Sequence, residues 1–140
     1  MPNLFVSPKG TIITNPMEPL LSAVYNGNTE EVIKLINERA NVNAINDHGS
    51  TALMLASAKC DTETVSKLLE AGANVNAINN YGQTALMVAS MHKCKETALE
   101  LIGKEADVET AKNGLIQKGM SQEAEFLENL VSFYLTHEDL

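Results

Sequence analysis

Two stretches of this sequence are nearly the same. NVNAINDHGSTALMLAS runs from Asn41 to Ser57, and NVNAINNYGQTALMVAS runs from Asn74 to Ser90. The stretches are 33 residues apart, and 13 of their 17 positions are identical. Identity of this density at a fixed offset indicates that the chain is built from copies of one structural unit.

The repeat weakens outside this stretch but continues in both directions. The positions that follow, 58–73 against 91–106, share four residues. Near the C-terminus, residues 119–124 resemble residues 27–32. The distance between these two segments is seven residues less than three repeat periods, which predicts a shortened unit without its projecting turn. An earlier copy is visible 33 residues upstream of the first stretch, at Ala23, Glu30, Val32, Leu35, Ala40 and Val42.

Each unit divides into a turn, a short helix, a polar break and a second helix. Gly49 and Gly82 lie in polar turns, where glycine can adopt a positive φ. Thr51 and Thr84 are placed to cap the apolar helices that follow them. One such helix pair cannot bury its own apolar face, so neighbouring units must stack. The second helices show apolar residues at helical spacing: Val65, Leu68 and Leu69, then Ala98, Leu101 and Ile102.

Further end signals support the same helices. Asn28, followed by Glu31 three residues later, predicts the start of a helix over 29–38. Gly72 is placed to end the second helix of its unit in the left-handed conformation.

These residues resemble the ankyrin repeat, a 33-residue unit of turn, helix and helix. The T-P-L-H-x-A signature of that family appears as TALMLA from Thr51 and as TALMVA from Thr84, and its G-A-D-V-N segment appears as GANVN from Gly72. The resemblance covers about residues 17–108. It implies an all-α, ankyrin-like solenoid of helix–turn–helix units with projecting turns and degenerate capping units at both ends.

The departures from the family pattern predict lower local stability. Alanine replaces proline and methionine replaces histidine in both copies of the signature. Arg39 and Glu105 stand where the family has the glycine that ends the second helix.

The repeat divides the chain into five segments. Residues 1–16 form a non-repeat arm, 17–45 the degenerate first unit, 46–78 the second unit, 79–108 the third unit, and 109–140 the shortened acidic last unit. In the last unit we expect helices over residues 109–118 and 121–136. For the arm, an extended segment, a small hairpin against the first unit and a mobile segment remain alternatives.

Composition restricts the classes of partner. The chain has 10 Lys and Arg against 18 Asp and Glu, a net charge of −8, which disfavours nucleic-acid binding. It contains no apolar run of the roughly 20 residues needed to cross a bilayer. The N-terminus lacks the pattern of a secretory signal, so we expect a cytoplasmic protein, with delivery into a host cell left open.

Signatures of catalysis and metal binding are missing. The sequence shows no Gly-rich phosphate loop, no nucleophile elbow and no closely spaced set of His, Cys and carboxylates, so we expect neither an enzyme nor a cofactor nor a metal. Equivalent positions of stacked ankyrin-like units are roughly 10 Å apart, beyond the ~7 Å limit for the Cα atoms of a disulfide. We therefore expect Cys60 and Cys94 to be free thiols in a reducing compartment.

Differences between the two matched stretches indicate where a partner binds. Three of the four differing pairs flank the turn glycines, and further differences follow at the ends of the first helices. In ankyrin-like proteins these turn tips and helix ends line the concave surface that contacts partners, with Tyr25, Asn26, Ile45 and Ile78 expected nearby. The alternative is drift at exposed positions. The predicted partner-binding residues are Asp47, His48, Ser50, Lys59, Asn80, Tyr81, Gln83, Met91 and His92.

The last predicted helix offers a second kind of function. Its apolar stripe, Ala124, Leu127, Leu130, Val131 and Tyr134, is expected to pack on the preceding unit. Phe126 and Phe133 lie off the centre of that stripe, and we expect them to widen the buried face. As exposed residues they would instead serve a self-associating structural or regulatory subunit, so that a homodimer is the alternative to a monomer that binds another protein.

Overall fold

The computed structural model of the protein describes residues 4–6, 12–14 and 18–137. These residues form two short strands and eight helices. None of these helices combines the length and apolar composition needed to cross a bilayer. The strands are β1 (Leu4–Val6) and β2 (Ile12–Thr14), and the helices are α1 (Pro19–Tyr25), α2 (Thr29–Asn37), α3 (Ala52–Ala58), α4 (Thr62–Glu70), α5 (Ala85–Met91), α6 (Lys95–Gly103), α7 (Val108–Gln117) and α8 (Ser121–His137).

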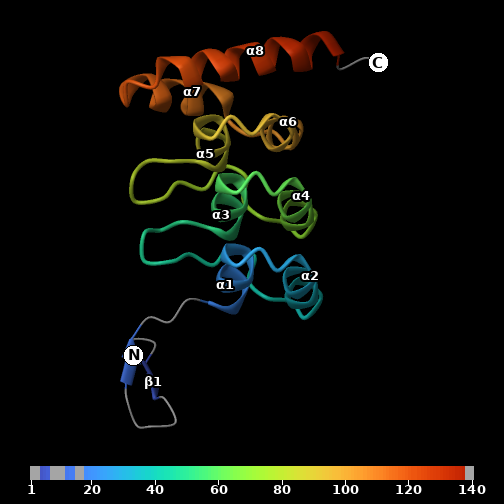
Figure 1. Ribbon diagram of the computed structural model, residues 1–140, viewed down its shortest axis with the longest axis vertical. Helices are drawn as coiled ribbons and strands as arrows, with labels where there is room; N and C mark the ends of the chain where they lie inside the picture. Colours follow the sequence, from blue (N-terminus) through green and yellow to red (C-terminus); the bar gives the residue numbers. More distant parts are fainter. Residues whose placement is uncertain (1–3, 7–11, 15–17, 138–140) are drawn as a thin grey trace.

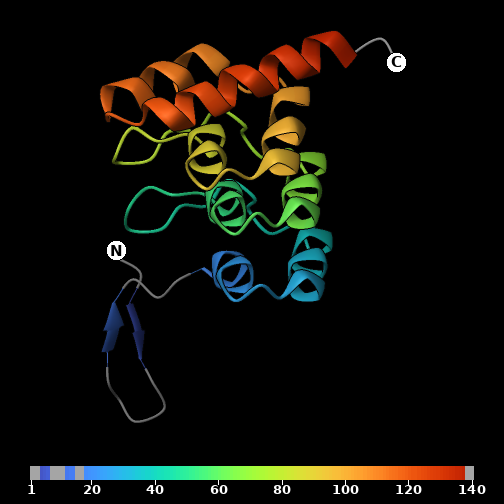
Figure 2. The same cartoon turned by 45° about the horizontal axis from the view of Figure 1, so that its top comes forward.

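The helices stand in two columns. Figure 1 shows α1, α3, α5 and α7 stacked in an inner column beside the projecting turns, and α2, α4 and α6 stacked in an outer column. Neighbours within each column pack on one another, and the two helices of each unit pack as a pair. Figure 2 shows α8 lying across the end of the stack. The predicted all-α repeat solenoid is therefore confirmed.

Side-chain caps begin the helices as the sequence predicts. The Thr51 hydroxyl accepts a hydrogen bond from the Met54 N–H, and the Thr84 hydroxyl accepts one from the Met87 N–H, both at 3.2 Å. Asn28 caps α2 by accepting from the Glu31 N–H at 3.2 Å. These bonds satisfy N–H groups that would otherwise lack a partner in the first turn.

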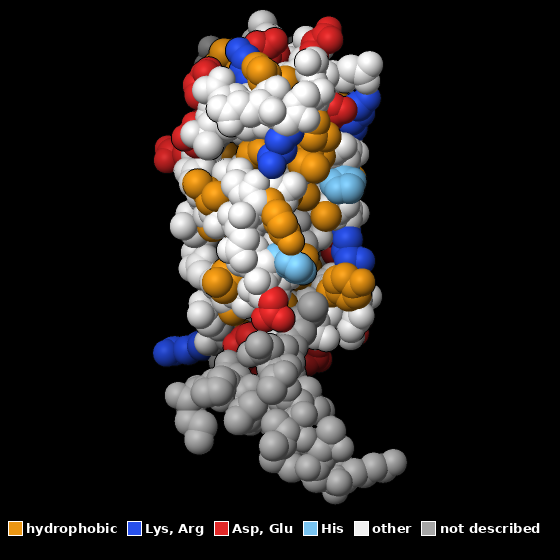
Figure 3. All heavy atoms as spheres, turned by 90° about the vertical axis from the view of Figure 1, so that its left-hand side faces the viewer, with side chains coloured by type: hydrophobic (Ala, Val, Ile, Leu, Met, Phe, Trp, Pro, Cys, Tyr) orange, Lys and Arg blue, Asp and Glu red, His pale blue; other side chains and the backbone are white. Residues whose placement is uncertain are grey.

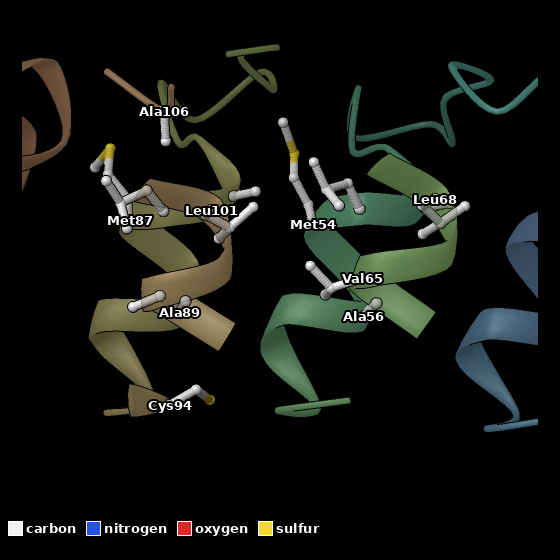
Figure 4. Packing of buried hydrophobic residues seen from close by; sticks show 14 of the residues in the cluster. Met54, Ala56, Val65, Leu68, Met87, Ala89, Cys94, Leu101 and Ala106 are labelled. Atoms are coloured by element: carbon white, nitrogen blue, oxygen red, sulfur yellow. The ribbon is translucent and has the colours of Figure 1, made fainter. Parts of the chain in front are cut away.

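The core repeats with the units. Leu20, Leu53 and Leu86 occupy equivalent positions 33 residues apart, and each is at most 1% exposed. Figure 4 shows the repetition directly, since Met54, Ala56 and Leu68 of the second unit have the same arrangement as Met87, Ala89 and Leu101 of the third. The apolar face of each helix pair is thus buried against the next pair.

The departures from the family glycine do not change the backbone. Arg39 (φ 66°) and Glu105 (φ 68°) adopt the left-handed conformation that Gly72 (φ 94°) adopts at the equivalent position. Cys60 and Lys93, both with φ 54°, do the same between the two helices of their units. Side chains are disfavoured at such φ values, so these four positions carry a conformational cost.

The helices of the last unit agree with prediction. The two helices expected over 109–118 and 121–136 are found as α7 and α8. Helix α8 has 17 residues against nine in α6, and it packs on α5, α6 and α7. Leu127 and Leu130 of the predicted stripe are buried, as is Ala124. The extra length lets α8 cover apolar surface of both columns.

Residues of the N-terminal arm form a hairpin. Strands β1 and β2 are antiparallel, with Phe5 paired with Ile13. Figure 1 shows this hairpin beyond α1, at the end of the stack. Of the three alternatives for the arm, the described residues show a hairpin, but Figures 1 and 2 show it beyond α1 and not packed against the first unit as that alternative had it. Residues 7–11, between the two strands, lie outside the described residues.

The prediction of free thiols is wrong. Cys60 and Cys94 form a disulfide, with their Cα atoms 5.3 Å apart. The expected spacing of roughly 10 Å applies to equivalent positions of stacked helices, but the position equivalent to Cys60 is Lys93, and Cys94 is one residue further along, with a sequence separation of 34. Both cysteines lie in the connections just before the outer helices. Neighbouring units touch there, since the Thr62 and Thr97 hydroxyl oxygens are 2.8 Å apart. The inference of a reducing compartment depended on free thiols and is therefore no longer supported.

Candidate partner-binding face

The turn of the second unit is held by one asparagine. The side-chain oxygen of Asn46 accepts hydrogen bonds from the His48 N–H at 2.9 Å and from the Ser50 N–H at 3.0 Å. The Asn46 N–H donates to the Ser50 carbonyl at 3.0 Å, which closes the loop. The turn is therefore rigid although it projects from the helices.

The turn of the third unit repeats this construction around Asn79. Its side-chain oxygen accepts from the Tyr81 N–H at 3.0 Å and from the Gln83 N–H at 2.9 Å. Its amide nitrogen donates to the Ser50 hydroxyl at 3.2 Å and to the Gln83 side-chain oxygen at 2.9 Å. Asn79 is 7% exposed, and its bond to Ser50 joins the two turns.

The tips of the two turns stack on each other. Asn80 donates from its backbone to the His48 carbonyl at 2.9 Å and from its side chain to the Asp47 carbonyl at 3.2 Å. The Tyr81 hydroxyl lies 2.9 Å from Nδ1 of His48, and the two rings are 5.7 Å apart between centroids. A Cβ added at Gly49 would come within 2.6 Å of the Asn80 side chain, so glycine is needed for the close approach.

Two lysines lie at opposite ends of this face. Nζ of Lys118, in the last unit, donates to the Tyr81 carbonyl at 3.0 Å. Nζ of Lys59 lies 5.3 Å from the centre of the Tyr25 ring, in the first unit, at a cation–π distance. The first, third and last units thus contribute to one continuous face with the second.

A shallow cavity opens on the same face between α3 and α5. Its volume is about 200 Å³. The Gln83 side chain closes one edge, because its amide lies 3.7 Å from the Met91 sulfur. The lining residues are Ser50, Met54, Leu55, Ala58, Asn79, Gln83, Val88, Met91 and His92.

The structure brings the nine predicted residues onto one face in three groups. The tips hold Asp47, His48, Asn80 and Tyr81, and Lys59 lies toward the first unit. The cavity holds the four others, which are Ser50, Gln83, Met91 and His92. Figure 3 shows this face, on which hydrophobic side chains and two imidazoles are scattered, with a few acidic and basic side chains beside them.

Sequence comparison missed two residues that shape the face. Asn79 is identical to its equivalent Asn46, and a search for differences between units passes over identical positions. Lys118 lies in the last unit, where no second copy exists for comparison. A search for polar residues with a turn-forming role identifies Asn79 from its position before Tyr81 and Gly82.

The described residues include no group of three His, Cys, Asp or Glu side chains that could hold a metal ion. The polar atoms at the tips are largely engaged with one another, as the hydrogen bonds of Asn79 show. What the face offers to a partner is exposed surface, including a Tyr81 side chain that is 56% exposed. This arrangement suits recognition.

Comparison with known proteins agrees with the geometry. A family model for ankyrin repeats, in three copies, matches residues 20–112, well over half of the chain. The chain belongs to the ankyrin repeat family. Ankyrin repeats generally mediate protein–protein interactions, and the family is generally a non-enzymatic interaction module. No curated protein matches this ankyrin repeat chain.

The two phenylalanines of α8 differ in their surroundings. Phe126 is half-buried and packs against the core, as expected for a residue that widens the buried face. Phe133 is 40% exposed, and its ring lies 5.0 Å from Nζ of Lys95. The two rings therefore do not form one exposed patch.

Proposed function

We propose that this ankyrin repeat protein binds another protein through the turn tips and the inner-helix ends, and that it carries out no chemistry of its own. The observation that carries the proposal is that the backbone of the two turns is the same whereas the side chains that the turns expose are different. Asn46 and Asn79 fix the two turns in the same way, while the exposed residues that they present differ. Because the turn backbones are already fixed by hydrogen bonds, little conformational entropy is lost when their side chains bind a partner.

The exposed residues have the character of interaction hot spots. Tyr81 offers a large amphipathic ring, and His92 borders the cavity below it. Aromatic residues carry a disproportionate share of binding energy in protein interfaces. Tyr81 and His92 are therefore the residues to remove first.

Affinity capture from native lysate tests the proposal. The baits are the wild type, the double variant Tyr81→Ala with His92→Ala, and the control Lys67→Ala with Glu70→Ala, whose side chains pair on the outer helix α4. We expect wild type and control to retain a protein that the double variant loses, while circular dichroism and melting stay unchanged. Retention of the same proteins by all three baits would remove this face from the proposal.

A second candidate function uses α8. Leu135 is 64% exposed and Phe133 is 40% exposed near the end of this helix, which favours self-association of two chains. Sedimentation across micromolar concentrations separates the two functions. A strict monomer eliminates self-association, whereas a dimer that Leu135→Ser abolishes supports it.

A further inference from the structure

We infer that the cavity between α3 and α5 is an anchor pocket for one apolar side chain of a partner segment that carries carboxylates beside this residue. This inference rests on the proposed function and adds the chemical class of the partner. It uses residues that the tips do not, because Met54, Leu55 and Val88 line the cavity.

The volume selects a side chain over a larger ligand. The cavity measures about 200 Å³. Sites for cofactors and drug-sized molecules have roughly 300–1,000 Å³. An apolar cavity of about 150 Å³ holds a benzene molecule. A leucine, methionine or phenylalanine side chain therefore matches this volume.

The lining selects an apolar occupant. Met54, which is 3% exposed, and Val88, which is 8% exposed, both line the cavity. Asn79 also lines it, but its oxygen and its nitrogen already make four hydrogen bonds within the turns. Met91 supplies a flexible thioether, which adapts to the shape of an occupant. Ser50 and Gln83, which also line the cavity, are hydrogen-bonded to Asn79. A polar group inserted away from the His92 imidazole would therefore lose water without gaining equivalent partners.

The charges around the cavity select an acidic segment. None of the nine lining residues is a carboxylate. The ammonium group of Lys59 lies toward the first unit, over Tyr25, and that of Lys118 lies toward the last unit, at the Tyr81 carbonyl. Among the residues placed on this face, these two cations outnumber the single carboxylate, Asp47 at the turn tip, in a chain whose net charge is −8. Carboxylates on either side of the anchor residue would approach one lysine each.

A cavity on the outer column provides an internal control. It measures about 220 Å³ and is lined by Ile33, Ile36, Asn37, Lys67, Glu70 and Ala71. Its size is similar, but Nζ of Lys67 lies 3.8 Å from a carboxylate oxygen of Glu70 in the same lining, so the lysine charge is already paired. A ligand chosen by size alone would enter both cavities, whereas an acidic ligand is expected to prefer the cavity between α3 and α5.

Nuclear magnetic resonance of the full chain with ¹³C-labelled methionine methyl groups tests the inference. The probes are three capped tripeptides: acetyl-Glu-Leu-Glu-amide, acetyl-Glu-Ala-Glu-amide and acetyl-Lys-Leu-Lys-amide. We expect the first, at millimolar concentration, to shift the methyl signals of Met54 and Met91. Replacing leucine by alanine should weaken binding about tenfold, because most of the buried apolar area is lost. The lysine peptide should also bind more weakly, and added salt should reduce that difference.

Two variants locate the binding. Ala58→Met places in the cavity the residue that the third unit has at the equivalent position, Met91, and should abolish the shifts. Ala71→Met fills the outer cavity in the same way and should leave them unchanged. Amide spectra of both variants establish that they are folded.

The outcomes separate this inference from the proposed function. Absence of methyl shifts with the first peptide, or equal binding by Ala58→Met, overturns the anchor pocket, and so does equal binding of the glutamate and lysine peptides at low salt. If the single variant Tyr81→Ala, which leaves every residue lining the cavity in place, nevertheless loses the captured partner, the proposed function stands without the pocket. If the peptide binds as described while capture is unaffected, the pocket stands and the tips are removed from the proposal.

Discussion

The junction between the second and third units differs from the junction between the first and second. Both use the same packing of inner and outer helices, and both have an equivalent asparagine bond: Asn43 accepts from the Asn74 N–H at 2.8 Å, and Asn76 accepts from the Asp107 N–H at 2.7 Å. The central junction adds the disulfide and the stacked turn tips.

One of these extra links, the stacked turn tips, belongs to the proposed contact face. Asn79 and Asn80 join the two tips, and the disulfide joins the beginnings of α4 and α6 behind them. In a linear array, stability is approximately a sum of unit terms and neighbour terms. We therefore expect the central pair of units to behave as one rigid body and the first unit to open more readily.

Removing the disulfide should have the largest effect on this difference. Replacing Cys60 and Cys94 with alanine opens a covalent loop with a sequence separation of 34. Loop-closure entropy for that length predicts a loss of about 3–4 kcal/mol from the free energy of unfolding. Denaturation in urea measures it, with the reduced wild type as the control. If the oxidised wild type and the alanine variant unfold at the same urea concentration, the disulfide does not stabilise the central junction.

Matched core truncations test whether the first unit opens independently. Leu20→Ala and Leu86→Ala remove the same side chain from equivalent buried positions, each at a cost of about 2–5 kcal/mol. We expect Leu20→Ala to speed amide exchange in α1 and α2 while the amides of α5 and α6 stay protected. Leu86→Ala should speed exchange throughout the central pair. Equal acceleration along the whole chain by Leu20→Ala would mean that the junctions are equally strong.

The parts of the fold that were predicted depend on local sequence. The caps Thr51 and Thr84 and the helix lengths follow from residues within one unit, so a single unit specifies them. The disulfide and the Tyr81–His48 contact depend on how far neighbouring turns lie from each other, which helix spacing does not give. The residues of the proposed face could be predicted because comparison of two similar units reveals the positions at which they differ. Lys118 could not be predicted in this way, because the last unit has no closely similar copy.

Restoring the family glycine should stabilise the ends of the second helices by a smaller amount. Arg39→Gly and Glu105→Gly relieve a left-handed conformation and are expected to add about 0.5–1 kcal/mol each after the entropy cost of glycine. Gly72→Ala is the matched control, since a Cβ there meets no atom within 4 Å and only the backbone cost is measured. We expect it to lose about 1 kcal/mol in the same denaturation assay. If Gly72→Ala instead raised the free energy of unfolding, the positive φ would not be what determines stability at these positions.

The smallest expected effect is a pH dependence at Asp107, beside the asparagine bond of the central junction. Its carboxylate accepts from the Thr110 hydroxyl at 2.6 Å and from the Thr110 N–H at 3.1 Å, and these bonds lower the pKa of Asp107 in the folded state. The carboxylate therefore stabilises the fold above its unfolded pKa, and this contribution is lost as the pH falls through the folded pKa. Asp107→Asn keeps an acceptor that does not titrate. The stability of the wild type relative to this variant should decrease as the pH is lowered from neutral to about 3, as measured by urea denaturation at each pH. A difference that stays constant over this range would mean that the ionised form of Asp107 is not what stabilises α7, and that the Asn76 bond to its backbone is sufficient to fix this end of the junction.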